Sequence, residues 1–181
     1  MDGLGGKNIL KRAVIAIVVI LVIIQFIHPD KNQNASVTDY HITKLYTVPE
    51  NVQRTLDNTC YDCHSNNTRY PWYSNIQPVN WWLNNHVVDG KRQLNFSDFG
   101  HYKLLKQVKK LREIVEEVEE GEMPLSSYTL IHKKAVLTAD QKQELTAWAK
   151  KLAEEIYAKV PPQDIEDEKK KQEARKLKEG K

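Results

Sequence analysis

The sequence predicts an all-α protein, in which a small helical domain follows a single N-terminal transmembrane helix. A nearly pure apolar stretch lies close to the N-terminus, and several later segments carry apolar residues at helical spacing. No segment alternates apolar and polar residues in the way that a half-buried strand does. With 181 residues, the chain can form one small domain with appendages.

The apolar stretch at residues 13–27, AVIAIVVILVIIQFI, is interpreted as a membrane anchor. It extends upstream past Lys11 and Arg12, whose long side chains can reach the membrane interface. Counted from Ile9 to Pro29, it has the roughly 20 residues that cross a bilayer. The basic residues before it predict a cytoplasmic N-terminus and an exported domain. A cleaved signal peptide and a buried core helix are the alternatives.

Composition divides the chain into four parts. Residues 1–30 form the expected anchor, and the small polar residues at 31–46 are typical of a tether. Residues 47–160 contain the periodic segments and form the expected domain. The tail at 161–181 is almost entirely charged, which predicts a solvated helix or a disordered end.

Within the domain, four segments have helical periodicity, and residues 65–78 between them are rich in Asn, Pro and aromatic residues, as in an irregular loop. Gly90 and Gly121 are the expected helix stops, and Thr138-x-x-Gln141 has the form of a capping box. The expected helices are Pro49 to Tyr61, Val79 to Val88, Tyr102 to Glu120, and the segment from Thr138 to Pro161.

The strongest motif is Cys60-Tyr61-Asp62-Cys63-His64, which uses both cysteines of the chain. C-x-x-C-H is the attachment signature of c-type haem. Two thiols three residues apart lie on one side of a helical turn and can each add to a haem vinyl group. The following imidazole is then placed to bind the iron as the proximal ligand. The motif therefore predicts covalent haem c on Cys60 and Cys63, with His64 as the proximal ligand.

Other interpretations of the motif stay open. A redox dithiol usually accompanies a βαβ pattern, whereas this flank is helical. A plain disulfide is compatible with an exported location. A zinc site would require Cys63 and its neighbour His64 to bind one tetrahedral ion, which is strained.

A second axial ligand has several candidates. Met123 is the only methionine besides the initiator, and it lies in Gly121-Glu122-Met123-Pro124-Leu125, directly after a helix stop. We predict Met123 as the distal ligand because Pro124 restricts the backbone that carries the thioether. His86, in the aromatic helix, is the alternative distal ligand. Two further possibilities stay open. The iron could be five-coordinate, or it could be bound by one of three other histidines: His41, His101 and His132.

Aromatic residues concentrate between the motif and the long helix. They could cover the flat apolar face of a haem or form an ordinary core. Those proposed for haem packing are Trp72, Trp81 and Trp82, with Tyr73 and Phe96 nearby. Arg69 and Arg92 could pair with haem propionates or serve as surface charges.

Three stretches together resemble the bacterial haem-binding domain proteins, a family of anchored proteins related to monohaem cytochromes c. They are TCYDCHSNNTRYPWYS, IQPVNWWLNNHVVDGKRQLNFS and GEMPLSSYTLIHKKAVLT. The resemblance implies a small cytochrome c-like helical fold at a bacterial inner membrane, with the haem domain on the periplasmic side. It also implies thioether attachment at Cys60 and Cys63, proximal ligation by His64, and a distal methionine that maps to Met123.

These observations predict a one-electron carrier with unidentified redox protein partners. A haem-based sensor or small-ligand binder with a labile sixth ligand is the alternative, and a scaffolding role for the fold is a third hypothesis. No Ser/His/Asp or paired-carboxylate arrangement is evident, so no enzyme activity is expected. The net charge of +3 is too small to predict nucleic-acid binding.

Overall fold

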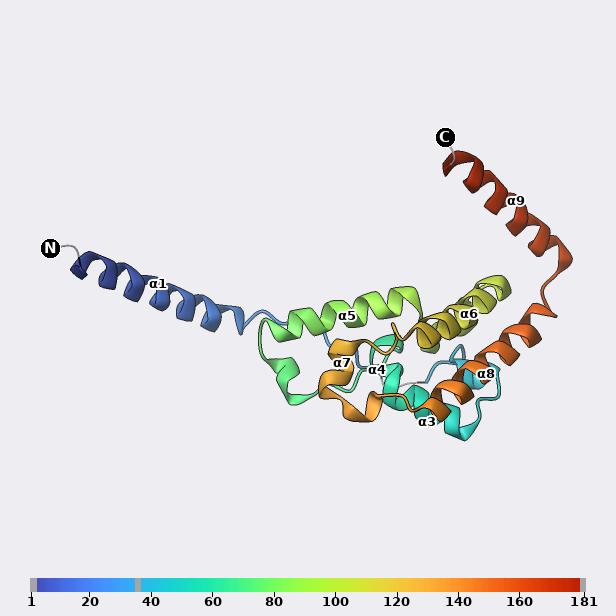
Figure 1. Cartoon of the computed structure of the whole chain (residues 1–181), viewed down its shortest axis with the longest axis horizontal. Helices are drawn as coiled ribbons and strands as arrows, with labels where there is room; N and C mark the ends of the chain where they lie inside the picture. Colours follow the sequence, from blue (N-terminus) through green and yellow to red (C-terminus); the bar gives the residue numbers. More distant parts are fainter. Residues whose placement is uncertain (1–2, 35–36, 180–181) are drawn as a thin grey trace.

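The computed structural model describes residues 3–34 and 37–179, and all regular structure in these ranges is helical (Figure 1). The prediction of an all-α fold is therefore confirmed. The α-helices are α1 Gly3–Ile24, α2 Ile42–Leu45, α3 Glu50–Thr59, α4 Tyr61–His64, α5 Val79–Gln93, α6 Leu104–Glu120, α7 Ser126–Ile131, α8 Ala139–Tyr157 and α9 Pro162–Glu179. Three 3-10 helices are η1 Trp72–Asn75, η2 Phe96–His101 and η3 Lys133–Ala135.

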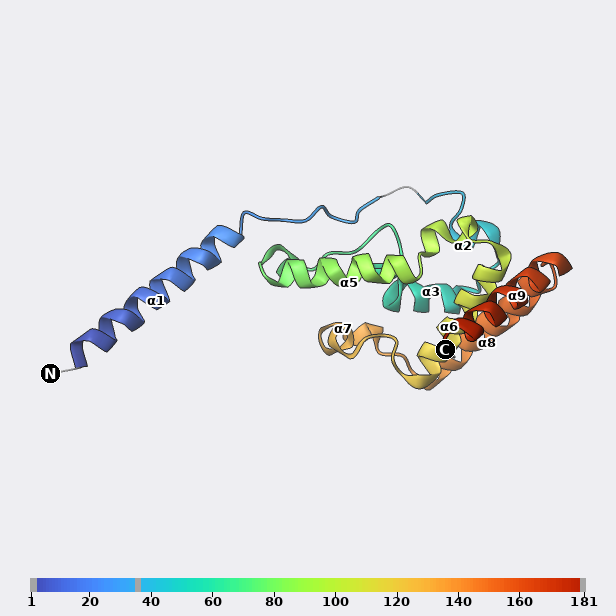
Figure 2. The same cartoon turned by 90° about the horizontal axis from the view of Figure 1, so that it is seen from above.

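Helix α1 projects away from the helical body (Figures 1 and 2), but the transmembrane prediction for residues 1–30 is wrong. No helix in the described ranges combines the length and the apolar character that crossing a membrane requires. Lys7, Lys11 and Arg12 lie within α1, and the helix ends at Ile24. Its uninterrupted apolar part, 13–24, therefore spans only about 18 Å at 1.5 Å per residue, against roughly 30 Å of hydrocarbon. The predicted position at an inner membrane, which depended on this anchor, is wrong as well.

The end of α1 is fixed to the body by hydrogen bonds. The Gln25 side chain donates to the carbonyl of Gln77 at 3.2 Å and accepts from its backbone N–H at 3.0 Å. Trp81 Nε1 donates to the carbonyl of Ile27 at 3.0 Å. The aromatic segment before and within α5 thus contacts the chain that leaves α1.

Part of the expected tether contacts the loop after the cysteine motif. The Asn32 side-chain amide donates to the Ser65 carbonyl at 2.8 Å, and the Thr68 backbone N–H donates to the Asn32 carbonyl at 2.8 Å. Gln33 and Asn67 form an isolated antiparallel bridge. Ala35 and Ser36, also within the expected tether, lie outside the described residues.

The core forms where α6 packs along α8. Leu111 of α6 and Leu145 of α8 are fully buried within it, as the helical spacing of their apolar neighbours predicts. Two of the three expected helix signals, the capping box and the stop at Gly121, are confirmed. Thr138 and Gln141 form a complete capping box at the start of α8. Gly121 ends α6 with a φ of 81°, a left-handed conformation that favours glycine.

Helix α5 is longer than predicted, because Gly90 lies inside it and does not end it. A Cβ atom on Gly90 would lie 2.8 Å from the carbonyl oxygen of Cys63 and 3.1 Å from its Cβ. Glycine is therefore required here by the close approach of α5 to α4. This contact sets the distance between α5 and the cysteine motif in α4.

Several short elements lie where no helix was predicted. The irregular loop at residues 65–78 contains η1, while η2, α7 and η3 occupy segments too short for a helical pattern to be visible. The charged tail forms α9, whose side chains are almost all exposed. Figure 1 shows α9 turning away from α8 at the C-terminal end.

We predict that Gly90→Ala destabilises the protein, because the new methyl group would collide with the backbone of Cys63. The direction of the change in unfolding free energy is informative, since alanine in a helix interior is ordinarily about 1 kcal/mol more favourable than glycine. Urea unfolding should give a lower midpoint for this variant. Val88→Ala, at an exposed position of the same helix, is the control and should stay within about 0.5 kcal/mol of wild type. A higher midpoint for Gly90→Ala would contradict the close approach.

Candidate functional site

A cavity of about 560 Å³ lies beside the cysteine motif, between α4, α5, α6 and the segment that leads into α7. Its volume is within the range of roughly 300–1,000 Å³ that is usual for cofactor and ligand sites. Apolar side chains from four parts of the chain form much of its wall: Leu94, Phe96, Ile114, Val118, Leu125 and Leu137. The remaining wall brings together the candidate haem-binding residues.

Cys60 and Cys63 both line the cavity, and both are free thiols. Cys60 lies between α3 and α4, and Cys63 lies within α4. Burial raises the pKa of Cys60 to about 12 and that of Cys63 to about 11. Both sulfurs therefore carry a proton at neutral pH, which differs from a redox dithiol that reacts through a thiolate of lowered pKa. No group of three or more His, Cys, Asp and Glu in the described ranges could hold a metal ion.

His64 is held in one orientation. Its Nδ1 lies 3.0 Å from the carbonyl oxygen of Leu94, and a hydrogen bond to a carbonyl requires the proton to be on Nδ1. Burial lowers the pKa of His64 below its ordinary value, so the ring is neutral at pH 7. This arrangement leaves Nε2 with a free lone pair, as a metal-binding histidine requires.

Met123 lines the same cavity, together with Pro124 and Leu125. Its backbone N–H donates to the carbonyl of Glu117 at 3.0 Å, which fastens the loop to the last turns of α6. The fold thus brings a methionine that lies 60 residues beyond Cys63 to the space beside the cysteine motif. The thioether is an uncharged soft ligand of the kind that cytochromes c use opposite histidine.

His86 of α5 also lines the cavity. Its Nδ1 donates to the Trp82 carbonyl at 2.8 Å, and its ring centroid lies 4.2 Å from that of Trp82. Both candidates for the distal position, Met123 and His86, therefore line the cavity. The other candidates do not line the cavity: His41 accepts a hydrogen bond at the start of α2, His101 stacks on Tyr40, and His132 stacks on Tyr128.

The aromatic residues expected to pack against haem are distributed differently. Trp72, Trp81 and Trp82 do not line the cavity, whereas Phe96 does. Trp72 is 78% exposed, and Trp81 hydrogen-bonds to the chain leaving α1. Of the aromatic residues that cluster in this part of the sequence, Trp81 therefore contacts the chain that leaves α1, and Trp81 and Trp82 both lie on α5.

The arginines named as propionate partners are engaged elsewhere. Arg69 pairs with Asp62 at 3.0 Å, and Arg92 pairs with Asp89 at 2.8 Å. Among the described residues lining the cavity, Lys110 is the only lysine or arginine. Its side chain is 12% exposed and its Nζ lies 2.6 Å from Glu113. Lys110 is one of four lysines at residues 103–110, so the sequence gave no signal that this one lines the cavity.

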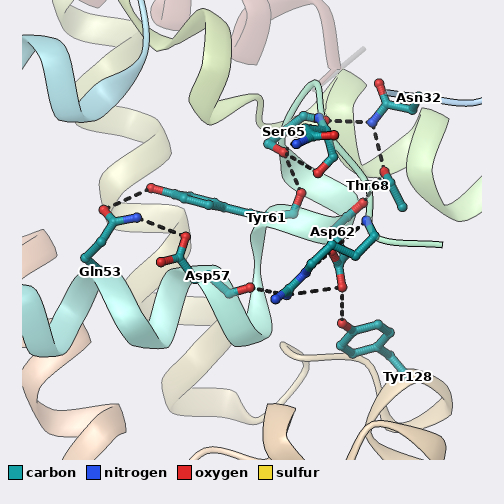
Figure 3. Close-up of polar contacts among 10 residues, drawn as sticks. Asn32, Gln53, Asp57, Tyr61, Asp62, Ser65, Thr68 and Tyr128 are labelled. Atoms are coloured by element: carbon teal, nitrogen blue, oxygen red, sulfur yellow. Dashed lines mark hydrogen bonds and ion pairs between the residues drawn. The ribbon is translucent and has the colours of Figure 1, made fainter. Parts of the chain in front are cut away.

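Asp62, between the two cysteines, was also missed. It is buried and accepts hydrogen bonds from the Arg69 backbone N–H at 3.1 Å, from Arg69 Nε at 3.0 Å and from the Tyr128 hydroxyl at 2.7 Å. Figure 3 shows Tyr128 directed from α7 toward this carboxylate. Tyr128 itself lines the cavity.

The residues around the cavity fit a haem. A cofactor-sized space with apolar walls is flanked by two thiols, a neutral imidazole with a free nitrogen, and a thioether. A comparison with protein-family models gives a match to the haem-binding domain over residues 19–151. No curated protein and no solved structure matches the chain. Because the family match covers well over half of its 181 residues, this chain belongs to the haem-binding domain family.

Proposed function

We propose that this protein is a c-type haem protein that carries single electrons. In this proposal Cys60 and Cys63 attach the haem covalently, His64 is the proximal ligand and Met123 is the distal ligand. The observation that carries it is the meeting of these four residues, from two distant parts of the sequence, on one cavity of about 560 Å³. Membership of the haem-binding domain family supports the cofactor itself.

The two thiols have the spacing and position for attachment. Each S–H can add across one vinyl group, forming one C–S and one C–H bond, so that nothing is released. Cys60 and Cys63 both line the cavity and neither is paired in a disulfide. Their neutral form makes them slow to oxidise, because the thiolate is the reactive species.

Haem also carries two propionates, which need cations or water. Lys110 is the candidate cation of the cavity wall, and it now pairs with Glu113. The neighbouring carboxylates of Glu116, Glu117 and Glu120 would repel a propionate. We therefore expect the propionates to point toward Lys110 or toward solvent.

Bound haem would supply a one-electron iron couple. With His64 and Met123 both bound, no position would remain open for a substrate, which favours electron transfer over catalysis. A sensor or small-ligand binder instead requires a labile or absent sixth ligand. The identity of the distal ligand therefore separates the two functions.

We predict that haem stays with the polypeptide through a denaturing gel when the full chain is produced in a host with c-type haem maturation machinery. Cys60→Ala combined with Cys63→Ala should remove haem stain from the band, because no thioether can then form. The single cysteine variants should each retain weaker staining through the remaining thioether. A wild-type protein that holds haem in native buffer but loses all of it in denaturant would contradict covalent attachment, while leaving haem binding intact.

We predict that Met123→Ala abolishes the weak far-red sulfur-to-iron charge-transfer band of the oxidised protein. The same variant should have a lower reduction potential and should bind carbon monoxide in the ferrous state, because the soft thioether no longer stabilises ferrous iron or blocks the site. His86→Ala, at the other distal candidate, is the matched control and should keep the band.

Two results would contradict this assignment. A wild-type protein without the band, whose spectrum changes in His86→Ala, would identify His86 as the ligand. Immediate binding of carbon monoxide by the wild-type ferrous protein would show a labile sixth position and would favour the sensor.

A further inference from the structure

We infer that Tyr128 is a positioning residue that holds Met123 at the haem through its hydrogen bond to Asp62. This inference rests on the proposed distal role of Met123. It concerns residues 121–131, the arm, which runs from the end of α6 through Met123 to the end of α7. The hydroxyl of Tyr128 joins this arm to the carboxylate that lies between the two cysteines.

The acceptor is firmly fixed. Asp62 is 7% exposed and lies within α4, with Cys63 next to it. Arg69 donates to Asp62 Oδ1 from its backbone N–H and from Nε, at 3.1 and 3.0 Å. Arg69 also donates from Nη2 to the backbone carbonyl of Asp57, so the pair is attached to α3 as well. Tyr128 donates to Oδ2 on the other side of the carboxylate, at 2.7 Å (Figure 3).

The donor is also held in place. The Tyr128 ring stacks on His132, with centroids 4.3 Å apart and an interplanar angle of 16°. His132 Nε2 lies 2.7 Å from the hydroxyl of Tyr73. These contacts orient the ring without touching the cavity motif, so the hydroxyl bond to Asp62 is the direct side-chain link between α7 and α4 among the described hydrogen bonds.

Met123 lies between two attachments of the arm. On one side its backbone N–H donates to Glu117 of α6 at 3.0 Å. On the other side the Tyr128 side chain donates to Asp62 of α4 at 2.7 Å. Met123, Leu125 and Tyr128 all line the cavity. Without the hydroxyl bond the C-terminal end of the arm would keep its contact with Tyr73 through His132 but would lose its direct link to α4, so that the thioether would be held less firmly beside the cysteine motif.

The bond is short and has an ionised acceptor, which makes it one of the stronger kinds of hydrogen bond in proteins. Because Asp62 keeps its bonds to Arg69, the carboxylate is not left alone when the tyrosine hydroxyl is removed. The main effect should therefore fall on the position of the arm. The cysteines and His64 should keep their places.

The test compares Tyr128→Phe with wild type in the haem-loaded full chain. The variant keeps the ring and its stacking on His132 but lacks the hydroxyl. We expect covalent haem to be unchanged on a denaturing gel, the far-red band of the oxidised protein to weaken, and the rate of carbon monoxide binding to ferrous protein to rise by roughly tenfold or more. Amide hydrogen exchange in α7 should also become faster.

Tyr46→Phe is the matched control. Tyr46 donates to Gln107 at 2.6 Å, so the substitution removes an equally short hydrogen bond, and neither of these two residues lines the cavity. It should lower the urea midpoint without changing the band or carbon monoxide binding. A purely structural role of Tyr128 predicts the same behaviour for both variants.

The outcomes separate this inference from the proposed function. An unchanged band and unchanged carbon monoxide binding in Tyr128→Phe, with the band present in wild type, would overturn the role of Tyr128 and leave Met123 as the ligand. Equal effects of Tyr128→Phe and Tyr46→Phe on the band would also overturn it. Absence of the band from the wild-type protein would overturn the Met123 assignment and this inference together.

Discussion

The buried carboxylate of Asp62 holds α4 in place, and the geometry of the cavity depends on that helix. Four residues long, α4 cannot be stable by itself. Asp62 connects it to Arg69 and Tyr128, while His64 connects it to the carbonyl of Leu94. Hydrogen bonds to a charged group contribute roughly 1.5–3 kcal/mol each, less where one partner is as exposed as Arg69. Tertiary contacts thus hold the cysteine motif in its helical conformation, which local helix propensity alone could not do.

The parts of the site that could be predicted are those in which chemistry is contiguous in the sequence. Cys60, Cys63 and His64 lie within five consecutive positions, so their shared place on the cavity wall follows from helical spacing. Met123 was singled out for another reason, as a lone methionine after a glycine helix stop, and the structure places it on the same cavity wall, while its role as an iron ligand stays a prediction. The capping box and the stripe along α6 also indicated helices that the structure contains.

A local excess of aromatic or apolar residues did not predict which parts of the chain these residues contact. The tryptophans after the motif predicted a haem face, yet Trp81 binds the carbonyl of Ile27 and Trp72 is exposed. The apolar run at the N-terminus predicted a membrane span because residues on both sides of Lys11 and Arg12 were counted together. In α1 these charges lie within the helix itself, and the helix ends at Ile24, before the run does. For the apolar run the error came from counting residues without knowing where the helix begins and ends. The haem contacts expected of the tryptophans stay a prediction, and none of the three lines the cavity.

No local sequence pattern could reveal the two long-range contacts that hold the walls of the cavity together, Gly90 with Cys63 and Tyr128 with Asp62. Gly90 looked like a helix stop, but it is needed because α5 approaches the backbone of Cys63. Tyr128 carried no signal of its own in the sequence, but it binds a carboxylate 66 positions earlier in the chain. Each pair joins the cysteine motif to a different wall, α5 on one side and the segment carrying Met123 on the other. The motif indicates which atoms could bind haem. These long-range contacts determine how far those atoms lie from the other walls of the cavity. They therefore determine whether a haem iron would be bound from both sides.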